Sequence, residues 1–295
     1  MITVTGHHFP PDGSEFDVGV QFTQRDFDIF AQLSGDNNPI HVDPVFAAQT
    51  RFGRTVAHGM LLFAVADAAI NRWIGGRLNL HEQRLLFPAP TFAGEEIALH
   101  LVLQPGPDDV RRLVDVVMST ASGETCRGQA LVGFDDLTAH SSPQPPTVTE
   151  ATQFKGLRIG MQAARTRLLN SGDIRTHVDV TDDPHPAYAD SPPMVPPALL
   201  GGAISDLLGV SLPGPGSNWL KQTYRFHRRV RAGDEIRSSV TINRLRPSKQ
   251  LVNLQTDLDI EEGTAMSGEA LLLVRDVADR SGGTSPATPE AGDLI

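Results

Sequence analysis

The feature that most constrains the fold of this chain is an internal repeat. Residues 85–97 (LLFPAPTFAGEEI) are echoed by residues 224–236 (YRFHRRVRAGDEI) at an offset of 139 residues. Two further segment pairs follow at offsets of 138 and 140 residues, namely 113–114 with 251–252 and 128–130 with 268–270. A near-constant shift across three separate segments indicates a duplicated domain.

The repeat divides the 295 residues into two bodies of similar size. We expect one domain over residues 1–137 and a second over 151–276, in agreement with the usual length of a domain. Residues 138–150 are rich in Ser, Thr and Pro, which predicts a linker. Residues 277–295 offer little to bury, which predicts a disordered tail.

Each half is predicted to consist of a helix followed by antiparallel strands, an α+β arrangement with the helix packed on one face of the sheet. The helical candidates are Pro44–Trp73 in the first half and Pro196–Leu208 in the second. The predicted strands, rich in β-branched and aromatic residues and separated by turn residues, are 84–87, 96–103, 112–120, 127–132, 221–227, 236–245, 251–260 and 267–274.

Composition excludes several classes of function. A formal net charge of −10 argues against a nucleic-acid partner. The single cysteine, Cys126, rules out a disulfide framework and a thiolate metal cluster within the chain. No metal-ligand set, nucleotide loop or cofactor motif is recognisable, so no cofactor is expected. The longest apolar stretch, Met60–Ile70, is too short to span a membrane, and with no recognisable signal sequence we expect a cytoplasmic protein.

The segment with the clearest chemical character is residues 27–48. Its first part has helical spacing, and Gly35-Asp36-Asn37-Asn38-Pro39 then breaks the helix, which places Asp36 and His41 on an irregular loop. A carboxylate and an imidazole together suit acid/base work on a water molecule. From the residues alone, a turn-forming role for Asp36 and a core position for His41 are favoured over the catalytic interpretation.

A second irregular point, residues 56–60 (VAHGM), directly precedes the apolar helix. Backbone N–H groups at a helix N-terminus favour developing negative charge. This position is therefore suited to stabilise an oxyanion, and Gly59 permits close approach of a ligand to the backbone.

Three blocks of the first half resemble the MaoC-like, (R)-specific enoyl-CoA hydratases. The blocks are residues 34–43 (SGDNNPIHVD), 57–62 (AHGMLL) and 83–96. The resemblance implies a hot-dog fold, an antiparallel sheet wrapped around a central helix, and here two such domains in tandem. It also implies reversible hydration of trans-2-enoyl thioesters to (R)-3-hydroxyacyl thioesters, which would make the protein a hydro-lyase of lipid metabolism.

Carried over by position, the resemblance makes Asp36 and His41 the catalytic pair. It places Gly59 at the thioester oxygen, and Asn38 and His58 beside the substrate. One departure is Asp67, eight positions past Gly59, where the short bacterial relatives carry a small polar residue. A solvated or capping role is expected for it.

The second half lacks the Gly-Asp-x-Asn-Pro-x-His pattern. Asp182, Asp183 and His185 lie close together, but the neighbouring prolines predict a rigid turn rather than a second site. By resemblance to double hot-dog hydratases, this half is expected to help enclose the acyl chain and bind CoA.

A basic cluster lies in the second half of this acidic chain. Arg225, Arg228, Arg229 and Arg231 crowd one predicted strand and turn. They suit the phosphates of CoA or of a phosphopantetheine carrier protein, and equally a soluble edge strand guarded against aggregation.

Two other functions stay open, a hot-dog thioesterase and a non-catalytic acyl-binding subunit. The expected partner is an acyl-CoA or acyl-carrier-protein thioester. The expected assembly is a monomeric pseudo-dimer or a homodimer.

Overall fold

In the computed structural model, which describes residues 8–138 and 150–279, the two halves share one antiparallel sheet of ten strands. The strand order is β1-β3-β4-β5-β2-β9-β12-β11-β10-β8. The first half supplies β1 (Glu15–Gln21), β2 (Asn79–Leu86), β3 (Glu96–Pro105), β4 (Arg111–Thr120) and β5 (Gly123–Gly133). The second half supplies β8 (Gln162–Leu168), β9 (Asn218–Phe226), β10 (Glu235–Arg246), β11 (Leu251–Ile260) and β12 (Gly263–Leu273). A separate hairpin is formed by β6 (Gln153–Phe154) and β7 (Leu157–Arg158).

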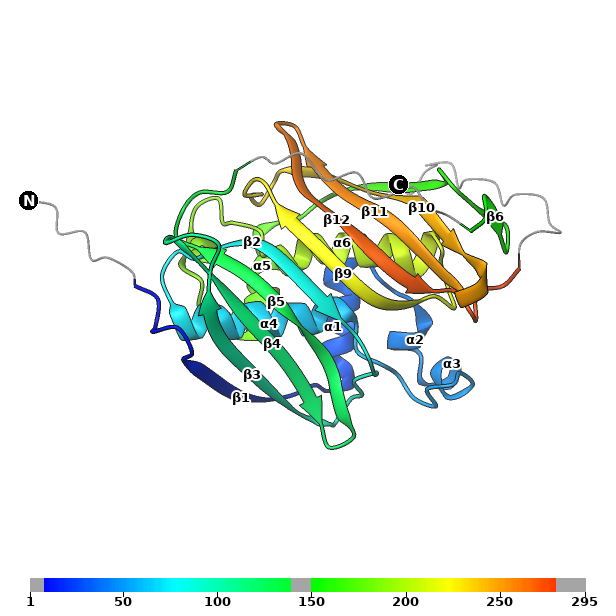
Figure 1. Cartoon of the computed structure of the whole chain (residues 1–295), viewed down its shortest axis with the longest axis horizontal. Helices are drawn as coiled ribbons and strands as arrows, with labels where there is room; N and C mark the ends of the chain where they lie inside the picture. Colours follow the sequence, from blue (N-terminus) through cyan, green and yellow to red (C-terminus); the bar gives the residue numbers. More distant parts are fainter. Residues whose placement is uncertain (1–7, 139–149, 280–295) are drawn as a thin grey trace, which may run out of the picture.

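The halves join where β2 pairs with β9, from Glu82 opposite Arg225 to Leu86 opposite Lys221. Figure 1 shows these two strands side by side at the middle of the molecule. The sheet therefore runs without a break from one domain into the other, and the predicted duplication takes the form of two related halves of one structure.

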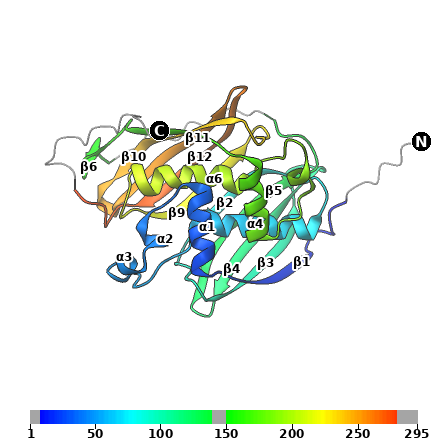
Figure 2. The ribbon, with the colours of Figure 1, turned by 180° about the vertical axis from the view of Figure 1, so that it is seen from behind.

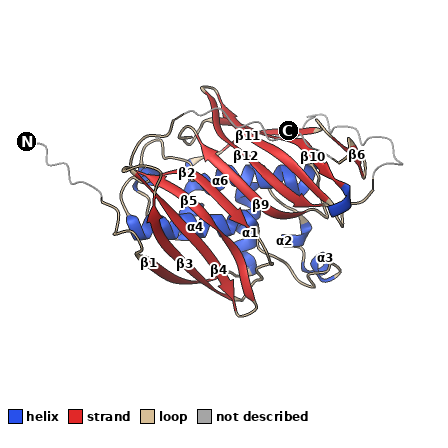
Figure 3. Ribbon diagram, viewed as in Figure 1, coloured by secondary structure: helices blue, strands red, loops and turns tan. Residues whose placement is uncertain are grey.

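The helices lie together on one face of the sheet (Figures 2 and 3). The first half has α1 (Gln24–Ser34), α2 (Pro39–Val42), α3 (Pro44–Ala48) and α4 (Gly59–Ile74), and the second has α5 (Ser171–Thr181) and α6 (Pro197–Asp206). A π-helical turn, η2 (Leu207–Ser211), continues α6, and the 3-10 turns are η1 (Pro186–Ala189) and η3 (Pro247–Lys249). Residues Met60–Asn71 of α4 are all buried, as expected of a helix that is apolar on nearly every side.

Corresponding elements reveal where the copies differ. From α1 to α5 the offset is 147 residues, but from α4 to α6 it is 138. Twenty-four residues separate Ser34 from Gly59, whereas only 15 separate Thr181 from Pro197. The nine extra residues of the first half lie within the stretch formed by α3 and a connector, residues 49–58, that leads into α4.

The expectation of a single helix over Pro44–Trp73 was wrong. The chain leaves the helical path after Ala48, turns through Gly53 in the left-handed region at φ 71°, and pairs Val56 with Phe92 before α4 begins. The end of the connector bonds the extended segment before β3, where the N–H of Ala57 donates to the carbonyl of Thr91. This backbone hydrogen bond takes the place of a helical one.

The eight predicted strands are all present, with shifted ends, and α6 lies within the predicted helix. The expectation of a duplicated α+β fold is thus confirmed. Of the predicted linker and tail, residues 139–149 and 280–295 lie outside the described residues. Within the described ranges, no helix combines the length and apolar character needed to cross a bilayer.

Candidate active site

A cavity of about 170 Å³ lies between the two halves. The first half contributes Asp36, His41 and Gly59 to its wall, and the second contributes Ser205 and Trp219. The loop after α1 and the start of α4 thus meet at one place, as the sequence predicted, but the opposite wall comes from the other copy.

Asp36 is held at the end of α1 by local backbone geometry. Gly35 adopts φ 84° and its N–H bonds the carbonyl of Ala31, which terminates the helix in a conformation suited to glycine. The Asp36 side chain is then directed inward, and the residue is only 2% exposed. Its Oδ2 accepts a hydrogen bond of 2.5 Å from the Ser205 hydroxyl.

Burial raises the pKa of Asp36 above its usual value, because a charged carboxylate is poorly solvated there. The nearby His41 and the hydrogen bond from Ser205 oppose that rise. The net effect is a pKa of Asp36 above its usual value.

The tautomer of His41 follows from one contact. Its Nδ1 lies 2.7 Å from the carbonyl oxygen of Val56, which can only accept, so Nδ1 carries the proton of the neutral ring. Nε2 is left as the nitrogen that exchanges protons with a ligand. The pairing of Val56 with Phe92 fixes that carbonyl, so the connector orients the imidazole.

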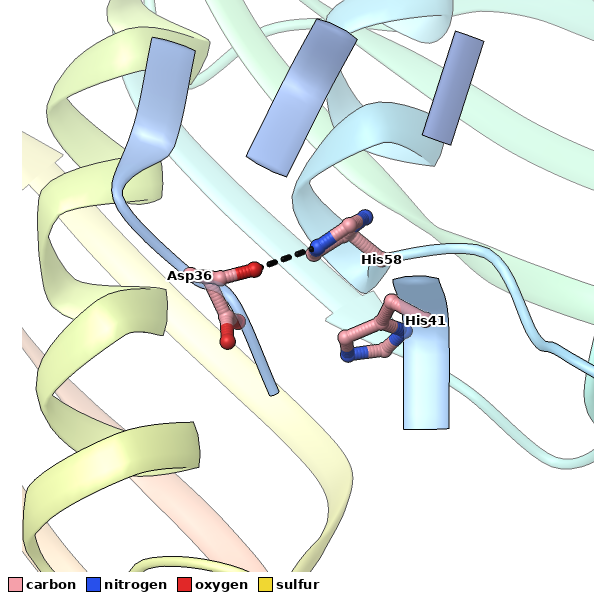
Figure 4. Close-up of side chains that lie close together, drawn as sticks. All are labelled: Asp36, His41 and His58. Atoms are coloured by element: carbon pink, nitrogen blue, oxygen red, sulfur yellow. Dashed lines mark hydrogen bonds between the residues drawn. The ribbon is translucent and has the colours of Figure 1, made fainter. Parts of the chain in front are cut away.

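His58 lies behind the pair. The residue is fully buried, and its Nε2 lies 2.9 Å from the backbone carbonyl of Asp36, as the dashed line in Figure 4 shows. Its ring stacks on that of His41 with centroids 3.8 Å apart. Burial lowers the pKa of His58 well below its usual value, which keeps the ring neutral. His58 does not line the cavity, so in place of the expected substrate contact it supports Asp36 and His41.

Gly59 is the first residue of α4, and it lines the cavity. A Cβ at this position would lie 2.9 Å from Cζ of Phe87, so only glycine allows this ring to rest on the helix start. The first N–H groups of a helix have no partner within it, which leaves them available to an oxyanion in the cavity.

The second half supports the catalytic loop with groups that the sequence reasoning missed. Besides Ser205, the carbonyl of Gly209 accepts a 3.2 Å hydrogen bond from the Asn38 side chain. Arg167 donates to the carbonyls of Leu33 and Ser34, which belong to the last turn of α1 and have no partner within the helix. A signal for Ser205 exists: it stands eight positions past Pro197, just as Asp67 stands eight past Gly59.

Asp36, His41 and His58 place three potential ligand atoms within 4.8 Å of one another, a spacing that suits a metal ion. However, Nδ1 of His41 and Nε2 of His58 are already hydrogen bonded to backbone carbonyls. Each imidazole therefore has one nitrogen left, and buried His58 would offer its Nδ1. Metal-ligating histidines also donate one ring N–H to a backbone carbonyl, so this hydrogen-bond pattern fits a metal centre as well as an acid/base pair with a supporting histidine.

The structure does not bring the predicted basic cluster to this cavity. Arg225 lies at the joint between the halves and bonds Glu82 at 2.9 Å. Arg228 and Arg229 line a different, smaller cavity of about 30 Å³, and Arg231 donates to the carbonyl of Pro192.

This smaller cavity is the counterpart of the active site in the second half. At the α1-to-α5 offset of 147 residues, Asp183 corresponds to Asp36 and Tyr188 to His41. The neighbouring prolines do lie in a tight turn, since Pro186 begins the 3-10 turn η1, and this turn occupies the place that the catalytic loop takes in the first half. It keeps a carboxylate and a different histidine, His185, but it has Tyr188 at the position of His41, and it lacks the longer connector.

Asp67 belongs to this second site. Only 4% exposed, it lies so close to Asp183 that their charges interact, while the amide of Asn71 bonds both oxygens of Asp183 at 3.2 Å. The expected solvated or capping role of Asp67 was thus wrong, because the inner face of α4 directs the carboxyl into the interface between the halves.

Comparison with known proteins agrees with this architecture. Residues 10–124 match the family described as "MaoC like domain", and residues 153–259 match the "FAS1-like, dehydratase domain region". The (R)-specific enoyl-CoA hydratase of Aeromonas caviae is 29% identical over 123 residues, which are 41% of this chain and 92% of the hydratase. The 3-hydroxybutyryl-CoA dehydratase of Methylorubrum extorquens is 28% identical over 130 residues, 41% of this chain and 83% of that enzyme.

Two solved structures resemble the whole chain in fold. A MaoC-like dehydratase aligns with a TM-score of 0.70 at 14% identity, over 89% of this chain and 98% of that one. A conserved hypothetical protein of Mycobacterium tuberculosis, described as having a double hotdog fold, aligns with a TM-score of 0.68 at 14% identity, over 90% and 96%. The continuous sheet and its helices thus define a double hot-dog protein. The chain thus carries two dehydratase-type domains, a MaoC-like domain over residues 10–124 and a FAS1-like dehydratase region over residues 153–259.

Proposed function

We propose that this protein catalyses the reversible hydration of trans-2-enoyl thioesters to (R)-3-hydroxyacyl thioesters. The observation that carries the proposal is the placement of Asp36, with its raised pKa, and His41 beside the N-terminus of α4 in one cavity. The relatives named above as an enoyl-CoA hydratase and a hydroxybutyryl-CoA dehydratase support the same reaction class.

In the hydration direction, Asp36 and His41 bind a water molecule and accept one of its protons as the oxygen bonds to C3 of the enoyl group. The C2–C3 π electrons move towards the thioester carbonyl, and a proton from the pair is then delivered to C2. The N–H of Gly59 stabilises the enolate-like oxygen, an interaction of the kind that contributes about 3–4 kcal/mol elsewhere.

The test is to incubate the purified protein with crotonyl-CoA and to follow the loss of enoyl absorbance and the chirality of the product. We expect (R)-3-hydroxybutyryl-CoA from the wild type and none from Asp36→Ala combined with His41→Ala. Release of free thiol instead would identify a thioesterase. No reaction with short or long enoyl thioesters, or full activity in the double variant, would refute the proposal.

A further inference from the structure

The carrier portion of the substrate must leave the cavity on a particular side, and its phosphates need a cation there. Among the described residues that line the cavity, Arg51 is the only lysine or arginine. It lies in the connector, residues 49–58, that follows α3. Figures 1 and 2 both place α3 at the periphery of the molecule, away from the joint between the halves.

The connector occurs only beside the complete site. In the second half, Asp183 and Tyr188 replace the catalytic pair. There the counterpart of the connector is shorter, and only six positions lead from Asp190 to Pro196. The first half spans the corresponding stretch from Asp43 to His58 with α3 and the connector. Arg51 thus belongs to a segment that accompanies the catalytic residues and is missing where they are missing.

The Arg51 side chain is held loosely enough to accept a ligand. It is 41% exposed, and its Nε lies 3.8 Å from Oδ2 of the exposed Asp276, longer than a good hydrogen bond. Its guanidinium also lies 4.7 Å from the centre of the Phe52 ring, which orients its plane. An oriented guanidinium suits bidentate binding of phosphate.

The neighbouring Arg54 provides a contrast within the same connector. Its guanidinium lies 3.9 Å above the Phe92 ring and bonds the Glu95 carboxylate at 2.5 Å, and it does not line the cavity. Arg54 is therefore already occupied. With a net charge of −10 on the chain, a weakly paired cation in the wall of the cavity has a large local effect on an anionic ligand.

We propose that Arg51 binds the phosphate of the pantetheine arm of the thioester substrate, with Asp276 as the group that the phosphate displaces. This inference rests on the proposed hydratase function. The same phosphate chemistry is present in CoA and in the phosphopantetheine of a carrier protein, so the carrier end of either substrate leaves the cavity past the connector.

The experiment compares crotonyl-CoA, crotonyl-phosphopantetheine and crotonyl-pantetheine, the last of which has no phosphate. In Arg51→Ala we expect the KM for crotonyl-CoA and crotonyl-phosphopantetheine to rise about tenfold. This is the lower end of the range expected when a charge-assisted hydrogen bond is lost at an exposed position. The KM for crotonyl-pantetheine and all kcat values stay unchanged. In Asp276→Asn the KM for crotonyl-CoA falls, and the matched control Arg54→Ala leaves it unchanged.

A rise confined to crotonyl-CoA would overturn the inference, because Arg51 would then act on the nucleotide part of CoA and not on the phosphate of the pantetheine arm. An equal rise for crotonyl-pantetheine, or an equal effect of Arg54→Ala, would overturn the inference. Failure of the wild type to hydrate any of the three substrates would instead refute the proposed function.

Discussion

At the scale of single residues, the chemistry depends on how Asp36 is surrounded. Burial raises the pKa of its carboxyl, and the hydroxyl of Ser205 opposes this rise through a 2.5 Å hydrogen bond. The residue that tunes the carboxyl therefore comes from the half of the chain that has lost the catalytic histidine.

Replacing Ser205 by alanine removes that hydrogen bond, so the pKa of Asp36 rises further. If the carboxylate form is the active one, the acidic limb of the pH profile of kcat/KM moves to higher pH, by up to about one unit. The control is Ser267→Ala, which removes a buried hydroxyl that bonds His227. An acidic limb that stays at its wild-type position would contradict the tuning role of Ser205.

The three grouped side chains also allow a prediction about metal. Because the proposed acid/base steps need only Asp36 and His41, we expect dialysis against EDTA to leave the rate of crotonyl-CoA hydration within about twofold of the untreated protein. A loss of activity that added Zn²⁺ or another divalent ion restores would instead make this trio a metal site.

At the scale of elements, the sequence predicted what strong local patterns encode. The apolar α4 and the eight alternating strands carry such patterns. The edge strand β8 (QAARTRL) was missed because most of its side chains are exposed, which leaves no alternation to detect. Helix α5 was missed for a related reason, since two of its three buried residues, His177 and Thr181, are polar.

The same distinction between local patterns and tertiary packing applies to the residues of the candidate active site. The loop with Asp36 and His41 was predictable because its motif is contiguous in the sequence. The support from Ser205, Gly209 and Arg167 was not, because these residues meet the loop only through the packing of one half on the other. The role of Asp67 depends on the same packing.

Helix α4 presents Asp67 to the loop after α5, and this contact makes stability depend on pH. Burial raises the pKa of Asp183 to about 6, and burial together with Asp183 raises the pKa of Asp67 well above its usual value. Backbone N–H of His185, the amide of Asn71 and the charge of Arg72 act on Asp183 in the opposite direction. The folded state thus binds more protons than the unfolded state, and stability falls as the pH rises through about 6.

Asp67→Asn removes one of the two carboxyls. We expect the free energy of unfolding in urea to exceed that of the wild type by about 1–2 kcal/mol at pH 8, since one pKa unit corresponds to about 1.4 kcal/mol. At pH 3.5, below the usual pKa of an Asp carboxyl, the carboxyl is largely protonated in both the folded and the unfolded state, and the difference should largely disappear. A variant that is less stable than the wild type at pH 8 would show that the Asp67 carboxyl stabilises the interface.

At the scale of the whole molecule, the pairing of β2 with β9 makes one sheet and one core from two copies. The two tryptophans report on different parts of it. Trp73 stacks on Phe16 within the first half, and Trp219 in the second half faces Phe87 across the cavity.

We therefore expect a single cooperative unfolding transition. In Trp73→Phe the fluorescence reports on Trp219, and in Trp219→Phe it reports on Trp73. In each variant, the urea midpoint of the fluorescence change should coincide with the urea midpoint of the loss of circular dichroism. A fluorescence midpoint clearly separated from the circular dichroism midpoint would mean that the halves unfold independently.

The central claim is that only one of the two equivalent loops performs chemistry. Asp36 and Asp183 occupy corresponding positions, but only Asp36 has a histidine, His41, at the position that Tyr188 takes in the second half. The most direct test is the rate of crotonyl-CoA hydration in Asp36→Asn and in Asp183→Asn. We predict a loss of about 10²–10⁴-fold for Asp36→Asn and a rate within about twofold of wild type for Asp183→Asn. Equal losses in both variants, or a large loss in Asp183→Asn alone, would contradict the account.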